Sequence, residues 1–304
     1  LQAGDRVGQI SNNRPEWVVV DFGSMHAGGV HVPLYPTLAS DGIEYILKDC
    51  AAKVAVAATP KHLEAIVSVE GNLNSLEHIV CMFDFGSQTS SKKLWKWEDF
   101  LQLGADHFEK HRAEMEARIE ATAATDVCSL VYTSGTTGEP KGAMLMHGNF
   151  VSNAITSVPL LEFQSDDLEL SFLPLSHVFE RVAYYAVTSV GAAIAYAESV
   201  DTVAANMKEV RPTVMPSVPR LFEKIHGRVM DKVKAGSPLK QKIFNWAMDV
   251  GKQHYLARAR GKVSNALKLQ YSFAHKLALQ KLHAETGGRI RIFASGGAPL
   301  RKDV

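Results

Sequence analysis

The sequence predicts an α/β fold built from βαβ units around largely parallel sheets. Residues 1–83 alternate short strand-like runs with runs that have helical spacing. The strand-like runs are RVGQIS (6–11), VHVPLY (30–35), KVAVAA (53–58) and HIVCMF (78–83), and the helix-like runs cover 16–29 and 40–50. Strands that alternate with helices favour parallel pairing, because each crossover helix returns the chain to the same end of the sheet.

Length and composition are those of a globular protein. The 304 residues suffice for two domains or one large α/β unit, and 46% of them are apolar against 21% charged. The three cysteines form no C-x-x-C pair, which favours a reduced, intracellular setting. The start lacks the basic and apolar segments of a signal peptide, so we expect a chain cut from something longer and not secreted. The most membrane-like stretch, 182–197, is too short to span a bilayer and predicts a buried helix followed by a strand.

Residues 98–120 are rich in Glu, Lys and Arg, which predicts a solvated helix. His107 and His111 lie one helical turn apart within it, a spacing that two metal ligands can use. No third ligand is evident, and charged neighbours surround both histidines. A solvated helix face is therefore favoured over a metal site.

The second half of the chain contains a strongly basic segment. Residues 127–150 follow the order strand, loop, strand and helix, with Asn149 as a candidate helix cap. Residues 220–283 carry 14 Lys or Arg against three acidic residues, and their apolar positions recur at helical spacing. Three interpretations of this basic segment stay open: a solvated surface, contact with an anionic membrane, or attraction of a polyphosphate ligand. Nucleic acid is disfavoured, because aromatic stacking residues are not interleaved.

Residues 132–142, YTSGTTGEPKG, place a polar loop between two apolar runs. The spacing is not that of a Walker A loop, because Pro140 precedes Lys141 and Gly142 follows it. Backbone N–H groups in such a turn can converge on one anion, and the lysine adds a cation. The hydroxyl groups of the loop could also ligate Mg²⁺. A phosphate cradle is favoured over a linker, because linkers do not usually join two apolar strands within a folded unit.

The same loop closely resembles the signature loop of the adenylate-forming (acyl-activating, AMP-binding) superfamily. FLPLSHVFERV (172–182) resembles the family's next motif, and FASGGAPL (293–300) resembles its adenine-binding segment. GDRVGQISNNRPEW (4–17) and AGGVHVPLYPT (27–37) are similar to its opening α/β segment. Within the superfamily, LPLSHVFER, PSVPRLFEKI and the basic segment most resemble long-chain fatty-acid–CoA ligases. The resemblance covers essentially the whole chain.

What the resemblance implies is a two-step reaction with ATP, Mg²⁺ and coenzyme A. A fatty-acid carboxylate attacks the α-phosphate of Mg·ATP to give acyl-adenylate and pyrophosphate, and the thiol of coenzyme A then displaces AMP. A carboxylate nucleophile needs no general base, so positioning and neutralisation of phosphate charge are the protein's main tasks. By the same resemblance the loop holds the β- and γ-phosphates, Thr136 lies nearest Mg²⁺ and Lys141 neutralises charge. The nucleotide-binding residues expected in the loop are Thr133, Ser134, Gly135, Thr136, Thr137, Gly138 and Lys141.

Further site residues follow from the other two motifs. His177 is expected beside the reacting carboxylate, at the mouth of the acyl pocket, as the third catalytic residue besides Lys141 and Thr136. Glu180 and Arg181 are either site residues or an ion pair behind the site. The apolar runs 182–196 and 214–222 are either tunnel walls or plain core. The segment expected to lie flat against adenine is Gly296, Gly297, Ala298 and Pro299.

The chain departs from the family by ending at Val304. The family continues with a Tyr-Gly-x-Thr-Glu segment whose Glu binds Mg²⁺, an Asp for the ribose, a hinge and a small C-terminal domain with a catalytic Lys. We therefore expect 1–304 to be a partial AMP-binding N-terminal domain that completes neither half-reaction alone. Its expected portions are 1–125, a first α/β part, and 126–304, with the ATP loop, the acyl pocket and a basic helical insertion at 220–283.

The parent protein is expected to be a cytoplasmic ligase, with peripheral membrane contact through 220–283 as an option and no nucleic-acid partner. Two alternatives stay open: an acyl-AMP ligase that delivers to a carrier protein, and a non-catalytic nucleotide- or lipid-binding module. Acyl chain length is not predicted, because pocket depth depends on packing.

Overall fold

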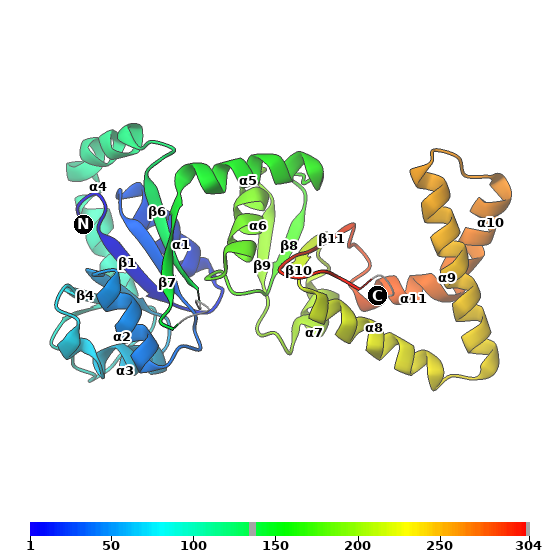
Figure 1. Ribbon diagram of the computed structural model, residues 1–304, viewed down its shortest axis with the longest axis horizontal. Coiled ribbons are helices and arrows are strands. Elements are labelled where there is room, and N and C mark those ends of the chain that lie inside the picture. The colour runs from blue at the N-terminus through cyan, green and yellow to red at the C-terminus, as the bar shows by residue number, and fades with distance from the viewer. Residues whose placement is uncertain (134–137, 302–304) are drawn as a thin grey trace. The chain divides into compact units, whose positions relative to one another are not determined.

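The chain forms two compact units, each with its own sheet (Figure 1). The computed structural model describes residues 1–133 and 138–301. The first unit comprises 1–162 and 174–189, and the second comprises 163–173 and 190–304. The division of the chain into portions 1–125 and 126–304 is based on sequence motifs and stays a prediction. The compact units begin and end elsewhere, because the two strands around the polar loop complete the first sheet.

The first unit is built on a seven-stranded sheet with the order β5-β4-β3-β1-β2-β6-β7. Its strands are β1 Arg6–Ile10, β2 Val30–Leu34, β3 Val54–Ala57, β4 His78–Cys81, β5 Lys93–Lys96, β6 Val127–Thr133 and β7 Lys141–Met146. All neighbours pair in parallel except β6 and β7, which form an antiparallel hairpin. The predicted α/β fold with a largely parallel sheet is confirmed. The edge strand β5 was not expected.

Helices cover this sheet, and local sequence signals mark where some of them begin. They are α1 Pro15–His26, α2 Ser40–Asp49, α3 Pro60–Val67, α4 Trp97–Ala121, α5 His147–Leu160 and α6 Val178–Ser189, with a 3₁₀ turn at Glu70–Asn72. Proline stands at the first position of α1 and α3, where no backbone donor is needed. Thr59 caps α3 by accepting the His62 N–H at 3.3 Å. Helix α5 begins before the predicted cap, but Asn149 Oδ1 still accepts the Met146 N–H at 2.9 Å.

The core of the first unit lies on both faces of the sheet. Along β3, Ala55 and Ala57 belong to the cluster that contains the buried face of α2, whereas Val54 and Val56 belong to the cluster on the opposite face. Such alternation follows from the two-residue period of a strand. Burial on both faces explains why β3 is apolar throughout.

Helix α4 has no buried residue, as expected of a solvated helix. His107 Nδ1 bonds the Leu103 carbonyl at 3.0 Å, and His111 contacts Glu114 at 3.3 Å. Within residues 1–133 and 138–301, no group of three or more His, Cys, Asp or Glu side chains could hold a metal ion.

The second unit contains a four-stranded parallel sheet with the order β11-β10-β8-β9. Its strands are β8 Leu168–Ser171, β9 Ala193–Tyr196, β10 Val214–Ser217 and β11 Ile292–Ser295. Its helices are α7 Val203–Val210, α8 Pro219–Lys234, α9 Pro238–Ala259, α10 Asn265–Ala274 and α11 Gln280–Glu285, with a π-helical turn at His275–Leu279. The stretch 182–197 is helix α6 followed by strand β9, as predicted.

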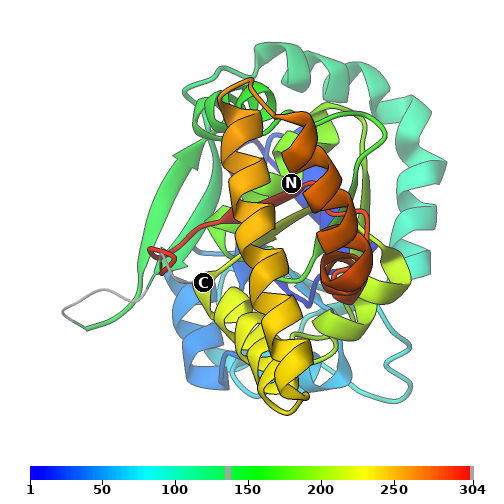
Figure 2. The same cartoon turned by 90° about the vertical axis from the view of Figure 1, so that its right-hand side faces the viewer.

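The basic segment 220–283 is helical, and α9 and α10 lie side by side (Figure 2). Ala247, Val250, Ala274 and Leu279 form a small core between these helices. Their outer face is not purely basic, because large apolar side chains are exposed among the cations. These are Leu239, Trp246, Met248, Tyr255, Leu256, Leu269, Phe273 and Leu277. None of the helices in the described part of the chain has the length and apolarity to cross a membrane.

Candidate functional site

The predicted phosphate loop lies at the end of the β6–β7 hairpin. Thr133, the last residue of β6, pairs with Lys141, the first residue of β7, and both are exposed. Gly138 has φ +132°, in the region that favours glycine. The structure therefore brings Thr133, Gly138 and Lys141 to one exposed hairpin end. An incoming anion can reach the ammonium group there, which fits a phosphate.

Four predicted loop residues lie outside the described residues: Ser134, Gly135, Thr136 and Thr137. Their roles at the phosphates therefore stay predictions. The same holds for Thr136 as the hydroxyl nearest Mg²⁺.

A buried tyrosine supports the hairpin next to its loop end. The Tyr132 ring packs against Gly142, where an added Cβ would lie 3.0 Å from Cζ. The Tyr132 hydroxyl donates to Asp49 Oδ2 at 2.5 Å, and Tyr45 meets the ring edge-on at a centroid distance of 6.4 Å. Burial and the hydrogen bond to Asp49 raise the pKa of Tyr132, so the phenol stays neutral. Gly142 is therefore needed for packing rather than for backbone freedom.

His177 ends the turn that precedes α6. The His177 N–H donates to the Pro174 carbonyl at 2.8 Å, and the Leu175 N–H donates to Asn13 Oδ1 at 2.9 Å. The His177 ring is exposed, and its Nδ1 accepts the Phe179 backbone N–H at 3.2 Å. His177 thus lies on a turn that is hydrogen-bonded both to α6 and, through Leu175, to the loop after β1.

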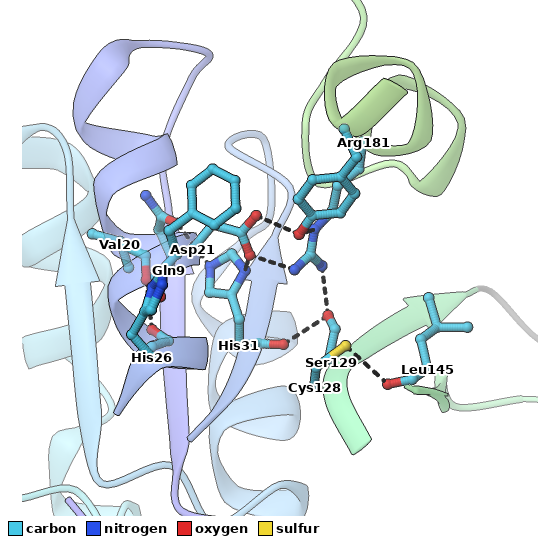
Figure 3. Close-up of polar contacts among 12 residues, drawn as sticks. Gln9, Val20, Asp21, His26, His31, Cys128, Ser129, Leu145 and Arg181 are labelled. Carbon is cyan, nitrogen blue, oxygen red and sulfur yellow. Dashed lines mark hydrogen bonds and ion pairs between the residues drawn. The ribbon is translucent and has the colours of Figure 1, made fainter. Parts of the chain in front are cut away.

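A buried polar network lies one turn further along α6 (Figure 3). Arg181 is 0% exposed and forms an ion pair with Asp21 on α1, which is also 0% exposed. Arg181 Nη1 donates to Ser129 Oγ on β6 at 2.6 Å, and Nε donates to the Tyr185 hydroxyl at 3.1 Å. An ion pair does lie behind the predicted site, and the partner of Arg181 in it is Asp21.

Asp21 is surrounded by groups that stabilise its charge. The Tyr185 hydroxyl donates to Oδ2 at 2.6 Å, and His31 Nδ1 lies 2.9 Å from Oδ1. Burial alone would raise the pKa of Asp21, but Arg181, His31 and Tyr185 lower it to about 2. Burial lowers the pKa of His31 despite the neighbouring Asp21, so its imidazole is neutral at pH 7. The network therefore contains one buried cation and one buried anion.

The network also reaches the centre of the sheet. His31 Nε2 lies 2.8 Å from Oε1 of Gln9 on β1, and the Ser129 hydroxyl donates to the His31 carbonyl at 2.8 Å. Phe150 on α5 lies under the guanidinium, 4.8 Å from ring centroid to Cζ. Side chains from α1, β6, α5 and α6 thus contact Arg181, and His31 and Gln9 extend the network to β2 and β1.

The predicted adenine segment follows β11 in the second unit. The Gly296 N–H donates to the Ser217 carbonyl at 3.0 Å, and Gly297 has φ +77°. Gly296–Gly297 therefore form a turn at the carboxyl end of a parallel sheet, where α/β proteins bind ligands. Ala298 and Pro299 continue from it and are exposed.

An open groove of about 500 Å³ also lies in the second unit. Its lining is Phe172, Val200, Val218, Arg220, Leu221, Glu223 and Lys224. Val218 and Leu221 belong to the run 214–222 that was considered as a tunnel wall, whereas no residue of 182–196 lines the groove. The groove combines apolar side chains with two cations and one carboxylate, and Arg220 pairs with that carboxylate, Glu223, at 3.5 Å.

Comparison with known proteins identifies the family. All 304 residues match the family model described as AMP-binding enzyme. Long-chain-fatty-acid–CoA ligase ACSBG2 of Xenopus laevis is 30% identical over 309 residues, which cover 98% of this chain and 41% of the relative. Long-chain-fatty-acid–CoA ligase FadD15 of Mycobacterium tuberculosis is 32% identical over 303 residues, which cover 99% of this chain and 48% of the relative. The chain thus spans less than half the length of these curated relatives.

Solved structures agree on the fold. The adenylation domain of a carboxylate reductase from Mycobacterium chelonae aligns with a TM-score of 0.67 and 22% identity, over 100% of this chain and 44% of the solved chain. This likeness confirms the predicted fold of an adenylate-forming N-terminal domain. From the full-length family match and the relatives at 30% identity or more, we conclude that the chain belongs to the AMP-binding enzyme family.

Proposed function

We propose that the chain is part of an ATP-dependent long-chain fatty-acid–CoA ligase. The relatives from Xenopus laevis and Mycobacterium tuberculosis carry that name and match this chain nearly end to end. The structural observation that carries the proposal is the β6–β7 hairpin, which presents Lys141 to solvent beside a glycine-containing loop. A fixed cation at the end of a rigid hairpin suits the phosphates of ATP.

In the proposed first step, the chain's own residues position the reactants and neutralise phosphate charge. Bound Mg·ATP supplies the electrophilic α-phosphate and the pyrophosphate leaving group. Lys141 offsets charge on the β- and γ-phosphates, and the turn at Gly296 and Gly297 receives the adenine ring. His177 donates a hydrogen bond to the acceptor oxygens at the reacting centre. None of these groups must remove a proton, because the attacking carboxylate is already ionised at pH 7.

The groove in the second unit is the candidate acyl-binding surface. Phe172, Val218 and Leu221 provide apolar contact for a hydrocarbon chain. Arg220 and Lys224 line the same groove, so it can also attract the carboxylate of a fatty acid or the phosphates of coenzyme A. This mixed lining supports an amphipathic anion as substrate.

To test the proposal, AMP release from ATP is measured with the longer parent protein that the uninterrupted reading frame encodes. Fatty acids of increasing length are compared, each with and without coenzyme A. Release that needs both a long-chain acid and coenzyme A supports the ligase. Acyl-adenylate that accumulates without reacting with coenzyme A favours delivery to a carrier protein. No AMP with any acid removes the substrate proposal.

Lys141→Ala separates an enzyme from a non-catalytic binding module. In an enzyme this variant abolishes turnover while fatty-acid binding persists. A module that binds lipid and nucleotide but releases no AMP, with or without the substitution, contradicts the proposal. The matched control is Lys110→Ala, which removes an exposed lysine from α4.

We further propose a cytoplasmic protein with peripheral membrane contact through 220–283. Exposed Leu269, Phe273 and Leu277 lie among the cations of this segment, an arrangement that suits the surface of an anionic bilayer. The comparisons do not support this contact, so it stays a prediction. Sedimentation with vesicles of neutral or anionic lipid tests it, and equal recovery in both supernatants contradicts it.

A further inference from the structure

Arg181 connects two of the segments of the first unit that resemble motifs of the family. It lies one helical turn after His177, whose carbonyl accepts the Arg181 N–H at 3.2 Å. Its Nη1 donates to Ser129, which lies on β6 four residues before Thr133. A single buried side chain thus joins the helix after His177 to the strand that leads into the phosphate loop.

The guanidinium uses its donors on three different residues. Nη2 donates to Asp21, Nη1 to Ser129 and Nε to the Tyr185 hydroxyl. This arrangement needs the planar fork of an arginine, because a lysine has the charge but not the geometry. Since the three acceptors lie on α1, β6 and α6, the network fixes α6 against the sheet.

The first turn of α6 contains the donor that determines which nitrogen of His177 holds the proton. Nδ1 accepts the Phe179 N–H at 3.2 Å, and Phe179 lies in the first turn of α6. An accepting Nδ1 carries no proton, so a neutral imidazole holds its proton on Nε2. The exposed nitrogen of His177 is then a hydrogen-bond donor rather than a base.

We propose that Arg181 is a positioning residue for His177. By fixing α6, Arg181 fixes the Phe179 N–H and with it the tautomer and direction of the imidazole. The inference rests on the proposed function, in which the oxygens of a carboxylate and a phosphate meet at the reacting centre. Both are acceptors, so an Nε2–H group attracts them, whereas the opposite tautomer presents a lone pair and repels them.

The direct test is the ¹⁵N spectrum of the His177 ring in the 304-residue chain. His177→Gln assigns the signal by removing it. Arg181→Lys and the milder Tyr185→Phe disturb the network. The control Arg291→Lys disturbs the corresponding arginine–carboxylate pair of the second unit, in which Arg291 Nε donates to Asp167 Oδ1 at 2.9 Å.

We expect the proton on Nε2 in the wild-type protein and in Arg291→Lys. Arg181→Lys should give a mixture of both tautomers, and Tyr185→Phe a smaller change in the same direction. An unchanged His177 tautomer in folded Arg181→Lys overturns the inference. If circular dichroism shows that Arg181→Lys does not fold, an unchanged tautomer in Tyr185→Phe overturns it instead.

A double-mutant cycle in the parent protein tests whether Arg181 acts through His177. Arg181→Lys should lower kcat for adenylate formation by about tenfold, with a smaller change in KM for ATP. In a His177→Gln background the same substitution should have little further effect. An equal loss in both backgrounds means that Arg181 does not act through His177, which overturns the proposal.

Failure of this inference can be told apart from failure of the proposed function, because ring spectra need no turnover. A parent protein that releases no AMP but shows the Arg181-dependent tautomer rejects the proposed function and supports the placement of His177 by Arg181. AMP release with an unchanged tautomer supports the proposed function and overturns this inference.

Discussion

Arg181 on α6 and Asp21 on α1 form a fully buried ion pair, although 160 positions separate them in the chain. Removing two charges from water costs several kcal/mol for each ion, so such pairs persist only where further hydrogen bonds satisfy the remaining atoms. Tyr185, His31 and Ser129 supply those contacts here. The pair therefore specifies how α1, β6 and α6 meet.

Breaking this pair from one side should be strongly destabilising. Asp21→Asn leaves the Arg181 charge buried without its anion, so we expect a loss of about 3–5 kcal/mol in the free energy of unfolding. Urea unfolding followed by circular dichroism measures it. The double variant Asp21→Leu/Arg181→Met removes both charges and should cost less than Asp21→Asn alone. A double variant that loses more than the single one contradicts this account.

His31 predicts a loss of stability on mild acidification. Burial lowers its pKa in the folded protein, whereas the unfolded chain binds the proton near the ordinary value of 6.5. As the pH falls, the unfolded chain therefore binds a proton at His31 before the folded protein does. The contribution of neutral His31 to the free energy of unfolding is complete above about pH 6.5 and decreases below that pH. Between pH 6.5 and 5.5, the free energy of unfolding of the wild-type protein should fall by about 1 kcal/mol more than that of His31→Asn. Exposed His111→Asn is the control and should follow wild type.

Burial of Glu169 on β8 predicts the opposite dependence of stability on pH. Burial raises its pKa to about 8, and neither carboxyl oxygen has a hydrogen-bond partner among residues 1–133 and 138–301. The folded state keeps a proton that the unfolded chain releases above about pH 4.5, so stability falls as the pH rises from there to 8. Glu169→Gln should flatten this slope and be more stable at pH 8, by a few kcal/mol at most.

The comparison for Glu169 is exposed Glu198→Gln, which should leave the pH dependence of unfolding unchanged. Thermal melts between pH 5 and 8 suffice for all three proteins. Parallel curves for wild type and Glu169→Gln would mean that Glu169 is ionised in the folded protein.

Gly142→Ala tests the packing of Tyr132 near the end of the β6–β7 hairpin. The added Cβ would lie 3.0 Å from Tyr132 Cζ, so the ring must shift and the hairpin with it. We expect a destabilisation of about 1–3 kcal/mol and weaker binding of ATP by the parent protein. Gly104→Ala on exposed α4 has nothing within 4 Å and should stabilise by about 0.5–1 kcal/mol. Unchanged ATP affinity in folded Gly142→Ala would contradict a link between this packing and the loop.

Much of the fold could be predicted from local patterns. β3 and β4 are apolar runs bounded by helical stretches, and their pairing follows from the α/β alternation. Strand β5 was missed because KLWK has only two apolar residues, with a lysine at each end, and lies at the sheet edge, where exposed cations are tolerated. Local pattern does not reveal an edge strand of four residues.

The candidate site was only partly predictable. Lys141 and His177 could be named because their neighbours in the chain form recognisable motifs. Asp21 and Ser129 could not, because their partner Arg181 is far away in the sequence. The available signal was a polar residue inside an apolar run, in WVVVDFG and in VCSLV. That pattern indicates a buried polar group, but only the tertiary structure shows which groups meet.

The most direct test of the central claim is ATP–pyrophosphate exchange by the parent protein, with and without a long-chain fatty acid. Exchange reports the first half-reaction alone, before coenzyme A is needed. We predict exchange that depends on the fatty acid, falls by at least about a hundredfold in Lys141→Ala and persists in Lys110→Ala. Exchange that is absent with every acid, or equal in wild type and Lys141→Ala, would contradict a phosphate-binding hairpin that activates a carboxylate.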